Sequence, residues 1–244
     1  MKKEHFRKRN KPLDGEGLFV DSWSSLKEYL STHPKRVKSV KCPEKDRRKL
    51  QDMMAQHGVT FPIDEGETLR VYIEEKFADE QDLDESISLL EKDVIVALDH
   101  ITDTRNLGAI LRSAAFFGVK RIVVPNDRQA PITQGTISTC QGALAFTTAY
   151  SVVNLKRTLK SLKSQGYWVV GADMGGEPLE RYASKFEKVV LVMGSEDKGL
   201  SKGVHDACDV IVSIQGTAPS VESLNVSVAS GILIQQFGKS LLTV

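Results

Sequence analysis

The stretch that decides the fold is VVLVMGSEDKGLS, residues 189–201, in which five apolar residues lead into a short loop enclosed by Gly194 and Gly199. A continuous apolar run is typical of a strand buried on both faces, as in a parallel sheet covered by helices. The loop nearly matches a phosphate-binding P-loop, but Leu200 stands where that motif requires lysine, which excludes an NTPase of that type. What remains is a tight loop that contacts a flat ligand, with Glu196 as an acceptor, or else a plain turn with solvated charges.

Further apolar runs on both sides of this stretch alternate with amphipathic segments. This alternation predicts an α/β domain with a parallel sheet, in which ligands bind at the carboxyl ends of the strands. The loops after Leu98, Met193 and Ile214 are therefore the candidate sites. The predicted strands are Val94–Leu98, Arg121–Val124, Trp168–Ala172, Val189–Met193 and Val210–Ile214, and the predicted helices are Leu107–Phe117, Leu155–Gln165 and about Ser223–Phe237.

The loop after Leu98 continues as DHITDTRNLGAILR, residues 99–112. Asn106 stands where a helix N-cap is expected, Gly108 permits a close approach, and Arg112 follows nearly two turns into the helix. A helix N-terminus with an arginine suits a phosphate-bearing ligand, although a capped helix with a surface arginine explains the segment equally well. His100 is a candidate base, but a lone histidine more often has a structural or solvent-exposed role.

The loop after Ile214 continues as QGTAPSVESLNVSVAS, residues 215–230. Ser223 is a good N-cap residue, so the segment predicts a loop followed by a buried helix. That interpretation leaves unexplained why Ser223, Asn225 and Ser227 place three polar groups in an otherwise apolar helix start.

Composition excludes several classes of protein. The 244 residues carry a formal net charge of +1, so nucleic-acid binding has to come from a local patch. No apolar run approaches the roughly 20 residues that cross a bilayer. The three cysteines are widely spaced without CxxC pairs, so neither a disulfide framework nor a metal site is expected, and a cytoplasmic protein fits best.

The first 92 residues differ in character from the rest. We expect residues 1–17 to be a disordered basic tail, 18–75 a small α/β domain, 76–92 a linker and 93–244 the main domain. Candidate basic patches are the tail and a second set of residues, which a solvated helix face would also explain. That second set is Lys35, Arg36, Lys38, Lys41, Lys45, Arg47, Arg48 and Lys49.

Taken together, the three loops resemble the motifs of the SPOUT superfamily, in its SpoU (TrmH) branch of RNA 2′-O-ribose methyltransferases. The resemblance rests on Asn-Leu-Gly-Ala-Ile-x-Arg from Asn106, Gly-Ser-Glu-x-x-Gly-Leu from Gly194, and Ser-Leu-Asn-Val-Ser-x-Ala from Ser223, in the family's order. It covers the chain from Val94 to the C-terminus.

The resemblance implies a C-terminal deep trefoil knot, a role in binding the substrate RNA for the small α/β domain of residues 18–75, a homodimer and S-adenosyl-L-methionine (AdoMet) as cofactor. AdoMet is then held by Met193, Gly194, Ile214, Ser223, Leu224 and Asn225. The catalytic residues that it implies are Arg112, Asn106, Glu196, Ser223 and Asn225. Because a guanidinium does not readily release a proton, Arg112 is assigned to positioning of the phosphate and the 2′-oxygen, and the base stays unassigned.

Two departures from the family pattern bear on the site. Asp103-Thr104 replaces the usual Asp-Pro before the motif asparagine, and Gln215-Gly216 replaces Pro-Met after Ile214, which alters the cofactor loop. The stretch from Val123 to Ala143 looks most similar to enzymes that make 2′-O-methylguanosine in large-subunit ribosomal RNA, so ribosomal RNA ranks above transfer RNA as substrate. A catalytically silent RNA-binding protein with the same fold is the alternative.

Overall fold

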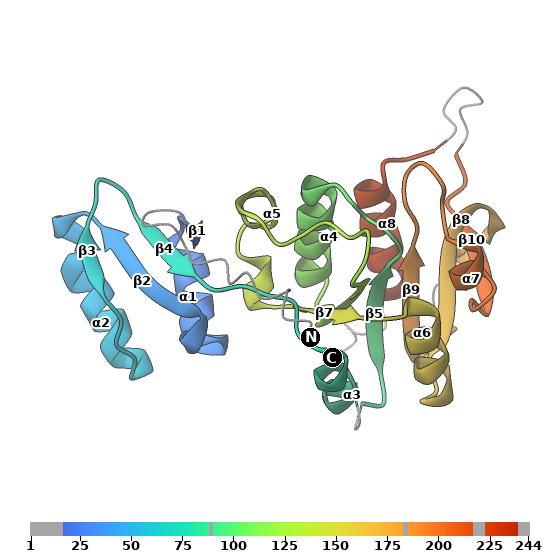
Figure 1. The fold of residues 1–244 in the computed structure, drawn as a ribbon, viewed down its shortest axis with the longest axis horizontal. Helices are drawn as coiled ribbons and strands as arrows, with labels where there is room; N and C mark the ends of the chain where they lie inside the picture. Colours follow the sequence, from blue (N-terminus) through green and yellow to red (C-terminus); the bar gives the residue numbers. More distant parts are fainter. Residues whose placement is uncertain (1–16, 88–89, 183–184, 217–222, 239–244) are drawn as a thin grey trace, which may run out of the picture.

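The computed structural model describes residues 17–87, 90–182, 185–216 and 223–238, which form two β-sheets with their covering helices (Figure 1). The predicted tail lies outside the described residues except for Gly17. No helix among the described residues is long and apolar enough to span a membrane.

The first sheet has four strands in the order β1-β4-β2-β3, with β2 and β3 parallel and the other two pairs antiparallel. The predicted helical spacing of Leu26, Tyr29 and Leu30 is confirmed, because all three are buried in the core of this unit. The elements are β1 (Leu18–Val20), α1 (Trp23–Thr32), β2 (Val37–Cys42), α2 (Arg47–His57), β3 (Ile63–Glu65) and β4 (Arg70–Ile73).

The second sheet has six strands in the order β10-β8-β9-β5-β6-β7, and every neighbouring pair is parallel. The predicted parallel-sheet α/β class is therefore confirmed, whereas the trefoil knot stays a prediction. The strands are β5 (Asp93–Leu98), β6 (Arg121–Pro125), β7 (Thr148–Val152), β8 (Trp168–Pro178), β9 (Lys188–Met193) and β10 (Val210–Ser213).

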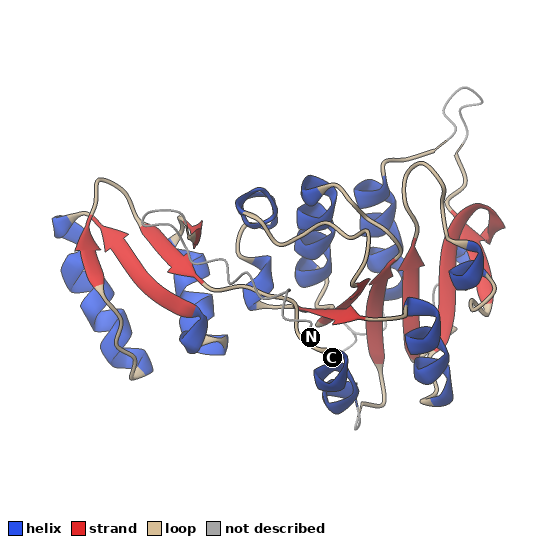
Figure 2. Cartoon of the chain, in the orientation of Figure 1, coloured by secondary structure: helices blue, strands red, loops and turns tan. Residues whose placement is uncertain are grey.

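Helices cover both faces of this sheet (Figure 2). Along β5, Val94, Val96 and Leu98 join one hydrophobic core, while Ile95 and Ala97 join the other, so the strand is buried from both sides as its continuous apolar run predicts. The helices are α3 (Glu80–Ile87), α4 (Thr104–Phe116), α5 (Gln134–Cys140), α6 (Leu155–Ser164), α7 (Lys202–His205) and α8 (Val226–Gly238).

Several boundaries differ from the predictions. Helix α4 begins at Thr104, with Asp103 rather than Asn106 as its N-cap, and α8 begins at Val226 rather than near Ser223. The segment that we expect to be a linker contains α3, whose Leu83 and Ile87 are buried against the large sheet.

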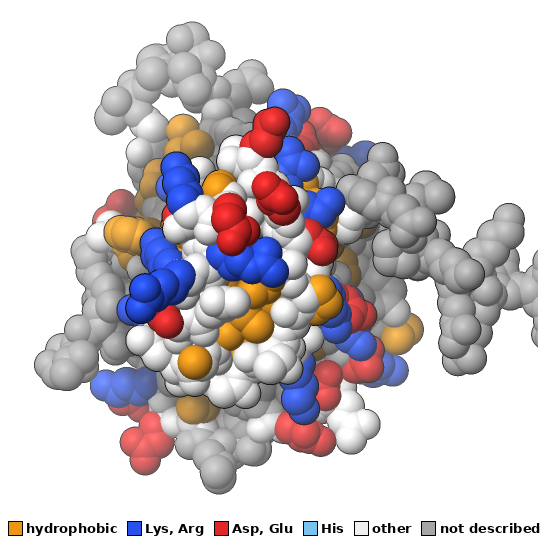
Figure 3. All heavy atoms as spheres, turned by 90° about the vertical axis from the view of Figure 1, so that its left-hand side faces the viewer, with side chains coloured by type: hydrophobic (Ala, Val, Ile, Leu, Met, Phe, Trp, Pro, Cys, Tyr) orange, Lys and Arg blue, Asp and Glu red, His pale blue; other side chains and the backbone are white. Residues whose placement is uncertain are grey.

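The basic residues between Lys35 and Lys49 do not form one patch. Arg36 pairs with Glu75, Lys38 with Glu74, and Arg47 with Glu44. In the view onto the small-sheet end of the molecule, lysine and arginine side chains are interspersed with acidic ones (Figure 3). These residues are therefore better described as part of a solvated surface of mixed charge than as a basic patch.

Candidate active site

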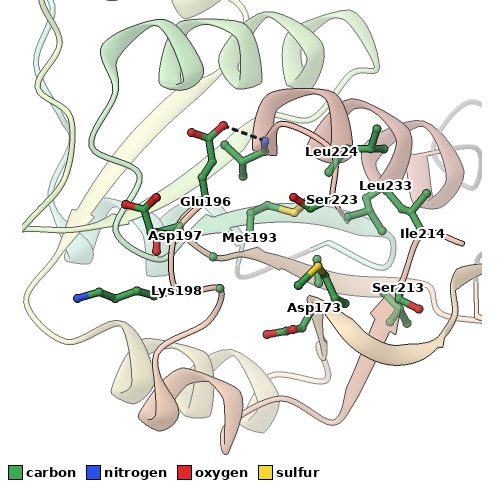
Figure 4. A pocket seen from close by; sticks show the side chains of 18 residues that line it. Asp173, Met193, Glu196, Asp197, Lys198, Ser213, Ile214, Ser223, Leu224 and Leu233 are labelled. Atoms are coloured by element: carbon green, nitrogen blue, oxygen red, sulfur yellow. Dashed lines mark hydrogen bonds between the residues drawn. The ribbon is translucent and has the colours of Figure 1, made fainter. Parts of the chain in front are cut away.

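A cavity of about 360 Å³ lies at the carboxyl edge of the large sheet, and two of the three candidate segments, those that follow Met193 and Ile214, contribute to its lining (Figure 4). It is lined by the middle of β8, by the ends of β9 and β10 with the segments that follow them, and by the first turns of α8. The lining residues are Ala172, Asp173, Met174, Met193, Gly194, Ser195, Glu196, Asp197, Lys198, Gly199, Val212, Ser213, Ile214, Ser223, Leu224, Val226, Ala229 and Leu233.

The loop after β9 is a closed, tightly packed turn. Ser195 and Gly199 exchange two backbone hydrogen bonds, of 3.1 and 2.9 Å. Gly199 adopts a left-handed φ of 62°, which favours glycine. A Cβ at Gly194 would lie 2.2 Å from the carbonyl carbon of Gly199, so only glycine fits there. The two glycines thus fix the loop that forms one wall of the cavity.

Asn225 joins all three segments through its side-chain amide. Its Nδ2 donates to Asn106 Oδ1 at 3.2 Å and also to Glu196 Oε1. Glu196 Oε1 in addition accepts the backbone N–H of Val226 at 3.3 Å, as the dashed line in Figure 4 shows. The structure therefore brings together three of the five predicted catalytic residues.

The orientation of the Asn225 amide follows from helix capping. Its Oδ1 accepts the backbone N–H of Ser227 at 3.0 Å and the Ser227 hydroxyl at 2.6 Å, while its carbonyl accepts from the backbone N–H of Val228 and of Ala229. Asn225 is thus the N-cap of α8, and its oxygen has to face the helix. The Nδ2 group is left to point at Asn106 and Glu196, which explains the polar residues in this helix start.

The carboxylate of Glu196 lies at the N-terminus of α8, where unpaired N–H groups and the helix dipole favour a negative charge. Through Val226 and Asn225 it fastens the loop after β9 to that helix. The Glu196 carboxylate is therefore a hydrogen-bond acceptor that is held in one orientation at the opening of the cavity.

Arg112 lies away from this cluster. It is exposed on α4, six residues after Asn106, a rise of roughly 9 Å along the helix. Within the described part of the chain it makes no hydrogen bond or ion pair, so its guanidinium is available to a ligand. Ser223 lines the cavity without a hydrogen bond to the Asn225 cluster among the described residues.

Asp99 supports the other end of the loop after β9. Its carboxylate is buried, accepts the backbone N–H of Ser201 at 2.6 Å, and lies 2.7 Å from Nδ1 of His100. His100 itself has a left-handed φ of 64°, an uncommon conformation for a residue with a side chain. The Asp99 carboxylate therefore joins the end of β5 to the loop after β9.

Asp103 caps the N-terminus of α4 beside this site. It accepts the backbone N–H of Arg105 at 2.7 Å, and that hydrogen bond lowers the pKa of its carboxyl group. No group of three or more His, Cys, Asp or Glu side chains in the described ranges is arranged to hold a metal ion.

The model of the SpoU rRNA methylase family matches residues 93–235, which is more than half of the chain. The chain belongs to this family. The match confirms the resemblance drawn from the three motifs, and it covers the whole large sheet together with the cavity and the Asn225 cluster.

A curated relative agrees with the family assignment. A protein of Mycolicibacterium gilvum described as an uncharacterized tRNA/rRNA methyltransferase is 44% identical over 146 residues, covering 60% of this chain and 46% of the relative. The chain thus matches only about half the length of that relative.

Two solved structures share the fold of this SpoU family member. The SpoU methyltransferase AviRb from Streptomyces viridochromogenes, in complex with AdoMet, has a TM-score of 0.77 at 19% identity, covering 93% of this chain and 91% of its own. An AdoMet-bound rRNA methyltransferase from Sinorhizobium meliloti has a TM-score of 0.77 at 20% identity, covering 93% and 88%.

Asp173 and Met174, which follow the predicted end of β8, are cavity residues that the sequence analysis missed. The signal was available, since they come directly after a predicted strand and so stand at the same sheet edge as the three loops that were chosen.

Proposed function

We propose that this chain is an AdoMet-dependent methyltransferase that modifies a ribose 2′-hydroxyl of RNA, a guanosine of large-subunit ribosomal RNA being the expected target. It acts as a homodimer in the cytoplasm. The observation that carries the proposal is the Asn106–Asn225–Glu196 cluster at the opening of a cavity of about 360 Å³ in a SpoU family member.

The cavity fits the chemistry of AdoMet. Its volume lies within the range of about 300 to 1,000 Å³ that is usual for small-molecule sites. Met193, Ile214, Leu224 and Leu233 form an apolar wall for the adenine, and Figure 4 shows Asp173 across from them. The carboxylates of the lining suit a cationic sulfonium. Bound AdoMet would supply an electrophilic methyl group.

The residues of the chain then have to orient an RNA ribose. A hydroxyl is a poor nucleophile at neutral pH, so alignment of its oxygen with the methyl carbon and the sulfur provides much of the rate. Asn106 and Asn225 form a rigid amide pair at the opening, and Glu196 holds that pair in place. Arg112, with no partner in the described residues, binds the phosphate next to the target ribose and positions its 2′-oxygen.

Two alternatives differ in what they predict. A tRNA 2′-O-methyltransferase would have the same site but another substrate, and the relative from Mycolicibacterium gilvum carries both RNA classes in its description. A silent RNA-binding protein would not need the glycine-restricted loop or the cavity, so binding of AdoMet separates it from both enzymes.

The test combines calorimetry with AdoMet and a methyl-transfer assay on unmodified ribosomal and transfer RNA. We expect AdoMet binding, transfer to ribosomal RNA, and a 2′-O-methylated nucleoside after digestion. Arg112→Ala should abolish transfer while AdoMet binding stays close to wild type. Near-normal turnover by that variant would refute the role given to Arg112, and absence of AdoMet binding by the wild type would refute the function.

A further inference from the structure

The small sheet has one face covered by α1 and α2 and another that no described helix covers. The buried side chains of its strands, such as Val40 and Val71, pack toward the helices. The strand residues that alternate with these buried ones have their side chains on the other face of the sheet, which we call the outer sheet face. They are Phe19, Ser39, Lys41, Arg70 and Tyr72.

Two aromatic rings lie side by side at the centre of the outer sheet face. Phe19 and Tyr72 are register partners on β1 and β4, and their ring centroids are 6.1 Å apart. Both side chains are half-buried, yet neither is among the described residues that form the two hydrophobic cores. They form an aromatic surface that packing of the core does not require.

A cation accompanies each ring. Lys41 Nζ lies 5.6 Å from the centre of the Tyr72 ring, and the guanidinium carbon of Arg70 lies 5.2 Å from that of Phe19. Within the described ranges neither cation forms a salt bridge, although Asp64 is the register neighbour of Lys41. The outer sheet face thus combines aromatic rings with two cations that form no ion pair with a carboxylate of the described residues.

We propose that the outer sheet face binds an unpaired stretch of the substrate RNA, an inference that rests on the proposed function. Bases stack on Phe19 and Tyr72, and each displaced cation turns to a neighbouring phosphate. An open sheet carrying aromatic and basic residues is a common surface for single-stranded RNA. Bases in a duplex are already stacked on each other and do not reach such rings.

Direct contacts link the outer sheet face to the candidate active site. The side-chain amide of Gln134, on α5, donates to the carbonyl of Phe19 and accepts its N–H, both at 3.0 Å. Helix α5 packs tightly on α4, since a Cβ at Gly108 would lie 2.7 Å from Cβ of Thr139. RNA bound to the outer sheet face is therefore connected through α5 to the helix that carries Asn106 and Arg112.

The test measures anisotropy of a fluorescein-labelled 12-nucleotide single-stranded RNA, alone and annealed to its complement, with the full chain. The variants are Phe19→Leu and Tyr72→Leu, which remove one ring each. Trp23→Leu is the matched control, because Trp23 carries Lys49 over its ring at 4.0 Å but lies on the helical side. Thermal melting verifies that every variant is folded.

We expect the single strand to bind more tightly than the duplex, and each ring variant to weaken binding by about 5- to 150-fold, the usual contribution of one stacked base. Lys41→Gln and Arg70→Gln should each reduce the slope of log affinity against log salt by about 0.7. The Trp23 variant should bind like the wild type.

Three results would overturn the proposal: ring variants that bind within twofold of the wild type, equal weakening in the Trp23 variant, or preference for the duplex. Calorimetry with AdoMet on the same samples judges the enzymatic function separately. A wild type that binds AdoMet but not the single strand refutes only the role of the outer sheet face.

Discussion

Gly194 offers the sharpest test of how the cavity is built. In Gly194→Ala the new Cβ would lie 2.2 Å from the Gly199 carbonyl carbon and 2.4 Å from both the Gly199 oxygen and the Leu200 nitrogen. These are backbone atoms, so the loop itself has to open. Loss of the two hydrogen bonds between Ser195 and Gly199 costs about 1–3 kcal/mol, and overpacking costs a further 1–3 kcal/mol. The sum is about 4 kcal/mol, which lowers Tm by roughly 8–16 °C.

The assay is scanning calorimetry together with titration of AdoMet. We expect Gly194→Ala to remain folded at 25 °C, because domains have about 5–15 kcal/mol of stability. It should bind AdoMet at least 100-fold more weakly, which corresponds to about 2.7 kcal/mol of binding free energy. Gly175→Ala is the matched control, since a Cβ there meets nothing within 4 Å. If Gly194→Ala melted and bound AdoMet like the control, the rigid loop would not be what forms the site.

Three further predictions concern single side chains. Asn225→Ala should lower the free energy of unfolding by about 1 kcal/mol through loss of the N-cap. The same variant should reduce the rate of methyl transfer at least tenfold in single-turnover assays. Ser227→Ala leaves Nδ2 of Asn225 in place, so its methyl-transfer rate should stay near that of the wild type. Burial raises the pKa of the Glu75 carboxyl group in the folded protein above its ordinary 4.5. The protonated carboxyl group therefore contributes fully to the free energy of unfolding below pH 4.5, and this contribution is lost as the pH rises through the raised pKa. Urea unfolding should therefore show the wild type losing stability relative to Glu75→Gln as pH increases from 4.5, and a pH-independent difference would contradict this. Burial raises the pKa of Cys208 to about 12, so at pH 8 only about one thiol in 10⁴ is thiolate, and mass spectrometry should find the Cys208 peptide unlabelled by iodoacetamide until urea is added.

The large sheet was predictable where its strands are buried on both faces. Strands β5 and β9 appear in the sequence as continuous apolar runs, and both lie at the centre of the sheet. Strand β7 was missed because it lies at the edge, where Thr148 and Ser151 interrupt its apolar residues. The end of β8 was missed because residues after Ala172 carry a register shift against β10 and include two glycines.

The helix starts were the weakest part of the site prediction. Asp103 and Asn106 are both good cap residues three positions apart, and so are Ser223 and Asn225 two positions apart, so local propensity does not choose between them. The choice depends on long-range contacts. Asn106 is needed by Asn225 from the other helix, and Asp103 is left to cap α4.

The same amide explains why three weak sequence signals define one site. Asn225 can cap α8 with its oxygen only if its nitrogen faces away from the helix, and the groups that meet it there come from α4 and from the loop after β9. The cap of α8, Asn106 on α4 and the loop after β9 therefore share one hydrogen-bond network. Because residues in one network are energetically coupled, a change in any of the three segments should disturb the other two. Each motif has little meaning alone, since the contacts of Asn106, Glu196 and the Asn225 nitrogen are made between motifs.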